Sequence, residues 1–120
     1  LDPRPQRAVK LKPRFCDTYN NLASAYMQLG HTKEAIETYK MALVLNRGLV
    51  DALSNLGNLF KAQGMLAEAK RCYQEAIRIQ PSFAIASSNL AGICKEEGNL
   101  TTAVAYYREA IRLCPEFADA

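Results

Sequence analysis

The chain of 120 residues is 49% hydrophobic and 22% charged, a composition that supports a folded core and excludes an intrinsically disordered segment. No apolar run reaches the ~18–20 residues that cross a bilayer, so we expect no contact with a membrane. The net charge of +3 comes from residues 1–14, while residues 15–120 carry ten basic and eleven acidic groups. This distribution argues against a nucleic-acid-binding face.

Residues 1–15 are expected to be a flank that ends in the remnant of a preceding helix. Residues 8–13 match the register of residues 76–81, at the end of a helix expected later in the chain. Pro5 occupies the register of Tyr39, so the helical similarity fails upstream of residue 8.

An internal repeat with a period of about 34 residues organises the rest of the chain. It divides the sequence into units at residues 16–49, 50–83 and 84–117, and residues 118–120 start a further unit. The aligned residues include Asn21, Asn55 and Asn89; Leu22, Leu56 and Leu90; Gly30, Gly64 and Gly98; Ala35, Ala69 and Ala103; and Tyr39, Tyr73 and Tyr107.

Within each unit the apolar residues recur at steps of three and four, which predicts two amphipathic helices and an all-α fold. The aligned glycine, Gly64 in the second unit, is expected to end the first helix because glycine tolerates the left-handed conformation of a helix C-cap. The aligned small residues are expected where two helices approach closely. The first helices carry an apolar stripe that we expect to be buried, formed by Tyr19, Leu22, Tyr26, Leu53, Leu56 and Phe60.

A helical hairpin of this length, with this order of small, glycine, alanine, aromatic and proline positions, resembles the tetratricopeptide repeat. The resemblance covers residues 16–117. It implies a right-handed superhelical solenoid of antiparallel helix pairs, with three repeats and partial flanking repeats. It also implies a protein-binding module.

The first helices carry a polar stripe opposite the apolar one. Asn21, Asn55 and Asn89 recur on it, and an asparagine amide can pair with both the N–H and the C=O of a peptide backbone. Repeats roughly 10 Å apart would place one asparagine at every third residue of an extended peptide, which rises ~3.3 Å per residue. Alternatively, these asparagines bond to neighbouring loops or helices of the chain itself.

Residues 55–64 and 78–92 resemble the repeat region of protein O-GlcNAc transferase, with the plant SECRET AGENT type as the closer likeness. That family lines its superhelix with an asparagine ladder, which implies a ladder of Asn21, Asn55 and Asn89 here. It also implies an acidic row of Asp17, Asp51 and Asp119, which Ile85 interrupts. Asn20 and Asn58 lie on the same stripe and complete the candidate peptide-binding residues.

The resemblance implies that the chain recruits extended or disordered protein segments as substrates. Its parent would be a UDP-GlcNAc-dependent glycosyltransferase whose catalytic domain lies outside this segment. We expect neither catalytic residues nor a cofactor within the chain.

A metal site is not expected, because the four cysteines are widely separated in the sequence and the chain has one histidine, His31. We expect the cysteines to be reduced, in the cytoplasm or the nucleus. Glu96 and Glu97 are expected to form a solvated pair at a helix end.

Two other functions are compatible with the repeats. A co-chaperone that clamps carboxylates requires Lys or Arg on the polar stripe, where this chain has Asn20, Ser24, Ile85 and Asn89. A structural scaffold or oligomerisation segment would use the outer face. Because an array buries apolar surface between repeats, exposed repeat ends also predict end-to-end self-association.

Overall fold

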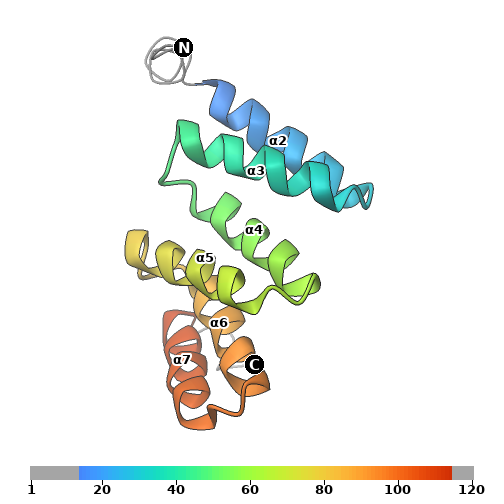
Figure 1. Ribbon diagram of the computed structural model, residues 1–120. Coiled ribbons are helices and arrows are strands. Elements are labelled where there is room, and N and C mark those ends of the chain that lie inside the picture. Colours follow the sequence, from blue (N-terminus) through green and yellow to red (C-terminus); the bar gives the residue numbers. More distant parts are fainter. Residues whose placement is uncertain (1–13, 115–120) are drawn as a thin grey trace.

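The computed structural model describes residues 14–114, which form six α-helices and no strand (Figure 1). The helices are α2 (Arg14–Gln28), α3 (Thr32–Leu45), α4 (Val50–Ala62), α5 (Leu66–Ile79), α6 (Ala84–Glu96) and α7 (Leu100–Leu113). The expected all-α solenoid of helix pairs is confirmed. The expected helix remnant in residues 8–13, Asp119 and the further unit at residues 118–120 lie outside the described residues.

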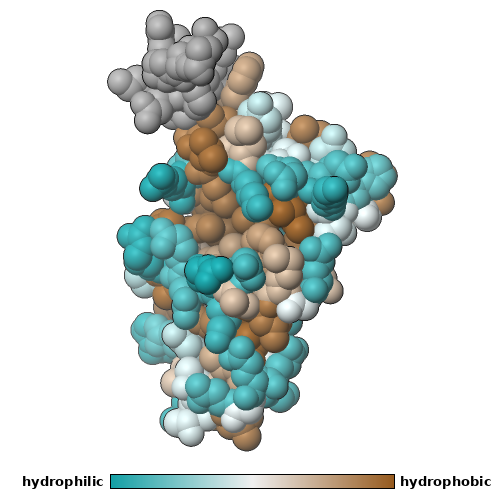
Figure 2. Space-filling model, viewed as in Figure 1, coloured by the Kyte–Doolittle hydropathy of each residue, from teal (hydrophilic) through white to brown (hydrophobic). Residues whose placement is uncertain are grey.

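The helices stack as three hairpins. Helices α2 and α3, α4 and α5, and α6 and α7 pack as pairs, and successive pairs meet through α3 with α4 and through α5 with α6 (Figure 1). The molecule is elongated, with principal extents of 47 × 27 × 25 Å. Apolar side chains reach the surface along the middle of the face in Figure 2, with hydrophilic side chains on both sides.

Each hairpin turns at the predicted glycine. Gly30, Gly64 and Gly98 have φ angles of 80°, 79° and 83°, the left-handed region that other residues rarely adopt. After α4, the N–H of Gly64 donates to the carbonyl of Lys61 at 2.9 Å, and the N–H of Met65 donates to that of Phe60 at 2.9 Å. These bonds satisfy carbonyls at the helix end, so the glycine-ended helix is confirmed.

The small residues lie where the helices approach closely, as predicted. Ala35 and Ala69 are fully buried beside the equally buried Tyr39 and Tyr73. At Gly57, an added Cβ would lie 2.8 Å from the Cε1 atom of Tyr73, closer than such atoms pack. Gly57 therefore allows the Tyr73 ring to lie directly against α4.

The expected burial of the apolar stripe is wrong for Leu22. The exposed fraction is 5% for Leu56 and 1% for Leu90, but 43% for Leu22. Leu22 lies on α2, the first helix of the described stack, which lacks the preceding hairpin against which α4 and α6 pack.

Candidate functional site

The asparagine ladder consists of one residue in the first helix of each hairpin. Asn21 on α2 is exposed, whereas Asn55 on α4 and Asn89 on α6 are half-buried. Two of the three amides therefore lie partly inside the stack.

At the junction between the second and third hairpins, Asn58 joins two side chains. The hydroxyl of Tyr73 donates to the Oδ1 atom of Asn58, and the Nδ2 atom of Asn89 donates to the same oxygen at 3.3 Å. Burial raises the pKa of Tyr73 to about 12, with the neighbouring Cys72 adding to the rise. The network therefore holds a neutral phenol that donates to a shared carbonyl oxygen.

At the junction between the first and second hairpins, the equivalent tyrosine lacks such a bond. The hydroxyl of Tyr39 is buried and makes no hydrogen bond of normal geometry. Burial raises its pKa, and Asn55 and Ser24 beside the hydroxyl oppose that rise, as donors to the oxygen would. Ser24 occupies the register of Asn58 in the preceding repeat.

The remaining candidates divide between surface and interior. Asp17, Asp51 and Asn58 are exposed, and Asn20 is half-buried. The Oδ1 atom of Asn20 is buried and has no hydrogen-bond partner. Ile85, which interrupts the predicted acidic row, has an exposed fraction of 58%. The structure thus places an exposed carboxylate on α2 and on α4 and an exposed apolar side chain at that register on α6.

The sequence analysis did not connect the asparagines to the tyrosines of the second helices. Both sets of residues recur with the repeat. The bond from Tyr73 to Asn58 lies within the second hairpin, and the bond from Asn89 to Asn58 crosses into the third. The recurrence of a polar residue at positions 24 and 58 is the signal that could have predicted it.

The described residues contain no group of three or more His, Cys, Asp or Glu side chains that could hold a metal ion. None of the four cysteines, all of which lie within residues 14–114, forms a disulfide bond, and Cys72 and Cys94 are buried. Burial raises the pKa of the Cys72 thiol to about 11, which disfavours the reactive thiolate. None of the helices between residues 14 and 114 is long and apolar enough to cross a bilayer.

Comparisons with known proteins identify the repeat. Family models described as tetratricopeptide repeat match residues 50–83 and 86–117, and one described as TPR repeat matches residues 23–64. No curated protein matches the chain significantly.

Among solved structures, two crystal structures of MamA are similar. One is 24% identical with a TM-score of 0.81, over 97% of this chain and 72% of MamA. The other is 24% identical with a TM-score of 0.77, over 96% of this chain and 67% of MamA. At this identity the likeness shows the fold.

Proposed function

We propose that this chain, which belongs to the tetratricopeptide repeat family of protein-interaction modules, binds extended protein segments along the first helices α2, α4 and α6. The observation that carries the proposal is the polar surface of these helices. It combines the asparagine ladder with the exposed side chains of Asp17, Asp51 and Asn58. A protein segment of extended backbone has the N–H and C=O groups that such amides pair with.

The ladder is only partly occupied by internal bonds. Asn89 uses one amide hydrogen on Asn58 and remains half-exposed, and Asn21 is exposed. An amide offers two donor hydrogens and a carbonyl with two lone pairs, so each asparagine can bond inside the stack and still meet a ligand. In this role the Asn58 bridge orients Asn89 toward the segment.

In its finer form, the proposal is that the chain recruits substrates for a protein O-GlcNAc transferase in the cytoplasm or nucleus. Its support is the likeness of residues 55–64 and 78–92 to the repeats of that family. Those residues include Asn55, Asn58 and Asn89, the half-exposed and exposed amides of the candidate face.

The first experiment measures binding of a fluorescent, unstructured peptide of Ser/Thr-rich sequence by anisotropy. Replacing Asn21, Asn55 and Asn89 with Ala is expected to weaken binding by roughly tenfold or more, since each amide hydrogen bond contributes about 0.5–1.5 kcal/mol. The matched control replaces Gln74 and Arg108, exposed residues on α5 and α7, with Ala. Unchanged binding by the ladder variant, with normal melting, contradicts the proposal.

The second experiment tests the transferase connection by competition. Added to a protein O-GlcNAc transferase and a long unstructured acceptor protein, the full chain is expected to sequester the acceptor and lower transfer. The ladder variant should not lower it. Transfer that stays the same with the wild-type chain, despite measured peptide binding, would remove the transferase connection and leave general segment binding intact.

A further inference from the structure

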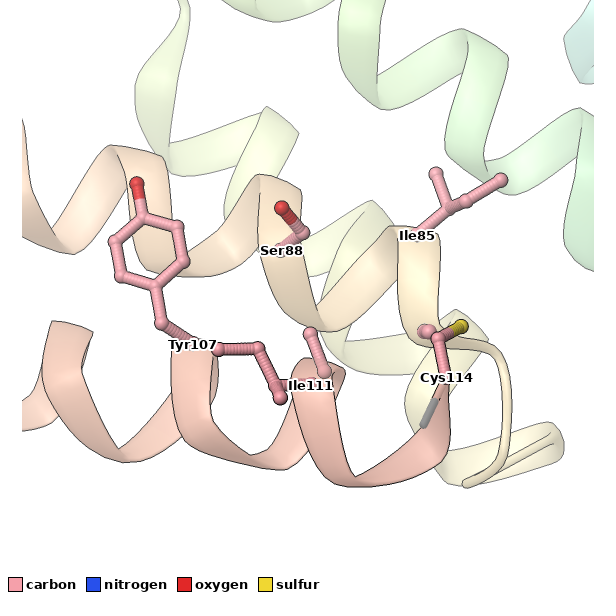
Figure 3. A pocket seen from close by; sticks show the side chains of 7 residues that line it. Ile85, Ser88, Tyr107, Ile111 and Cys114 are labelled. Carbon is pink, nitrogen blue, oxygen red and sulfur yellow. The ribbon is translucent and has the colours of Figure 1, made fainter. Parts of the chain in front are cut away.

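An apolar groove lies between α6 and α7 at the C-terminal end of the described stack. Its volume is about 400 Å³. In Figure 3, Ile85 and Ser88 line it from α6, and Tyr107, Ile111 and Cys114 line it from α7. Ile85 and Ile111 have exposed fractions of 58% and 53% and lie on the same groove, and contiguous exposed apolar surface marks interaction sites.

The groove repeats a surface that is covered twice within the chain. Tyr39 and Tyr73, two repeats and one repeat before Tyr107, are fully buried, whereas Tyr107 is half-buried. The reason is that α4 packs on α3, and α6 packs on α5, but no described helix packs on α7 in the same way. The groove is therefore the third copy of the surface that accepts the first helix of a hairpin.

The matching surface lies at the other end of the same chain. Helix α2 has the register of α4 and α6, and its Leu22 has an exposed fraction of 43% where Leu56 and Leu90 are buried. Leu29, at the end of α2, is 69% exposed. Among residues 14–114, α2 and the groove thus expose complementary halves of one interface.

The contacts across the internal junctions fix which residues would meet. Lys70 on α5 pairs with Glu97 at the end of α6 at 3.0 Å. The residues at these two registers in the uncovered surfaces are Val104 and Leu29, and both are apolar and more than half exposed. Where an internal junction has an ion pair, the two ends therefore carry an apolar pair.

A second contact supports the same register. Leu43 and Val44 of α3 lie with Leu53 of α4 around one depression at the first junction. The residues that correspond to Leu43 and Leu53 at the ends are Ile111, on the groove, and Tyr19, on α2.

We infer that the groove between α6 and α7 accepts helix α2 of a second copy of this chain, in the geometry of the internal junctions. The contact is heterologous, because the groove of one copy meets the first helix of the next. Repeated in this geometry, the contact continues the superhelix instead of closing a ring, so the chain forms head-to-tail stacks that lengthen with concentration.

Sedimentation velocity over a range of concentrations tests the inference on the full chain. The wild-type chain is expected to form a concentration-dependent ladder of dimers and larger stacks. Leu22→Glu, on α2, and Ile111→Glu, in the groove, are each expected to weaken association about tenfold or more, because each buries a charge in the contact. Thr101→Glu, at an exposed position of α7, adds the same charge as a control and should leave association unchanged.

Mixing the two defective variants distinguishes a specific contact from general stickiness. Leu22→Glu retains its groove and Ile111→Glu retains its α2, so an equal mixture is expected to form one heterodimer and nothing larger. Val104→Glu places a charge opposite the apolar Leu29 of the second copy and provides a second variant of this surface if Ile111→Glu melts early.

Three results would overturn the inference. They are a wild-type chain that is monomeric at every concentration, variants that associate as the wild type does, and a mixture that forms no heterodimer. A chain that associates only after residues 115–120 are deleted would likewise overturn it, because the groove would then belong to the chain's own end.

Discussion

The two internal junctions share one tyrosine geometry and differ in the polar contacts around it. At the second junction, Asn58 accepts hydrogen bonds from Tyr73 and from Asn89, and Lys70 pairs with Glu97. The first junction buries Tyr39 equally well without a hydrogen bond of normal geometry. There, the ammonium group of Lys40 lies 5.9 Å from the centre of the Phe60 ring.

The comparison distinguishes the apolar packing that both junctions share from the polar contacts that differ between them. In both hairpins a buried ring packs inside the hairpin core: Tyr73 lies against Gly57, and Tyr39 belongs to the same buried cluster as Ala23. The polar contacts vary with single side chains, such as Ser24 against Asn58. Apolar packing therefore defines the repeat, and the hydrogen bonds decide how each junction responds to pH, substitution and salt.

The largest expected difference appears in alkaline solution. The pKa of Tyr73 is raised from 10.0 to about 12 in the folded chain, so the folded state holds its proton longer than the unfolded state. That contribution to stability is complete below pH ~10 and is lost as the pH rises to about 12. Its size is roughly 3 kcal/mol, from about 1.4 kcal/mol per pKa unit.

Urea unfolding between pH 8 and pH 12 measures this loss. Between pH 8 and pH 12 the free energy of unfolding is expected to fall less for Tyr73→Phe than for the wild type. The difference between the two decreases should be up to that amount. Tyr39→Phe is expected to change the slope less, because Ser24 and Asn55 oppose the rise in the pKa of Tyr39. If the free energy of unfolding falls with pH equally steeply in the two variants, the pKa values of Tyr39 and Tyr73 are not shifted differently.

The next effect concerns the glycine beneath Tyr73. Gly57→Ala places a methyl group 2.8 Å from the ring and moves Tyr73 away from Asn58, which makes the second junction more like the first. Overpacking costs about 1–3 kcal/mol, and the higher helix propensity of alanine offsets about 1 kcal/mol of it. We expect a net destabilisation of about 1 kcal/mol in urea titrations.

Gly92→Ala, on α6, is the matched control. An added Cβ there would meet its nearest atoms, on Lys61 and Tyr107, at 3.7 Å, an ordinary contact. Only the propensity gain remains, so this variant should be more stable by about 0.8–1 kcal/mol. Two glycine variants that shift stability in the same direction would refute the close packing of Tyr73.

The parts that could be predicted from the sequence are those set by local periodicity. The helical hairpins follow from apolar spacing, and the turns follow from Gly30, Gly64 and Gly98, whose left-handed conformation is a property of the single residue. The positions of the candidate asparagines on the first helices were predictable for the same reason.

The contacts between hairpins were not predictable, because they join side chains far apart in the sequence. Asn89 bonds inside the stack to the amide oxygen of Asn58, which lies 31 residues earlier. Glu97 is exposed, as expected, but Lys70 of the preceding hairpin, 27 residues away, also pairs with it. Side-chain length and the rotation between hairpins decide both contacts, and neither follows from the period of the repeat.

The smallest expected effect is the ion pair between Lys70 and Glu97. Its side chains have exposed fractions of 33% and 37%, so solvent screens the attraction. A double-mutant cycle of Lys70→Met and Glu97→Gln is expected to give a coupling of about 0.5 kcal/mol at low salt. In ~1 M salt the coupling should be largely lost, because the Debye length falls to about 3 Å.

The first junction provides a reference for this double-mutant cycle, because it has no ion pair at the same registers. The registers of Lys70 and Glu97 are occupied there by Ile36, which is 8% exposed, and by Gln63. The matching substitution Gln63→Glu places a carboxylate opposite an apolar side chain and should show no salt-dependent coupling to Ile36→Val. If both junctions show a salt-dependent coupling of equal size, the coupling comes from the overall charge distribution of the chain and not from the pair of Lys70 and Glu97. A salt-dependent coupling at the second junction alone would show that the two interfaces between hairpins share their apolar packing but differ in their polar contacts.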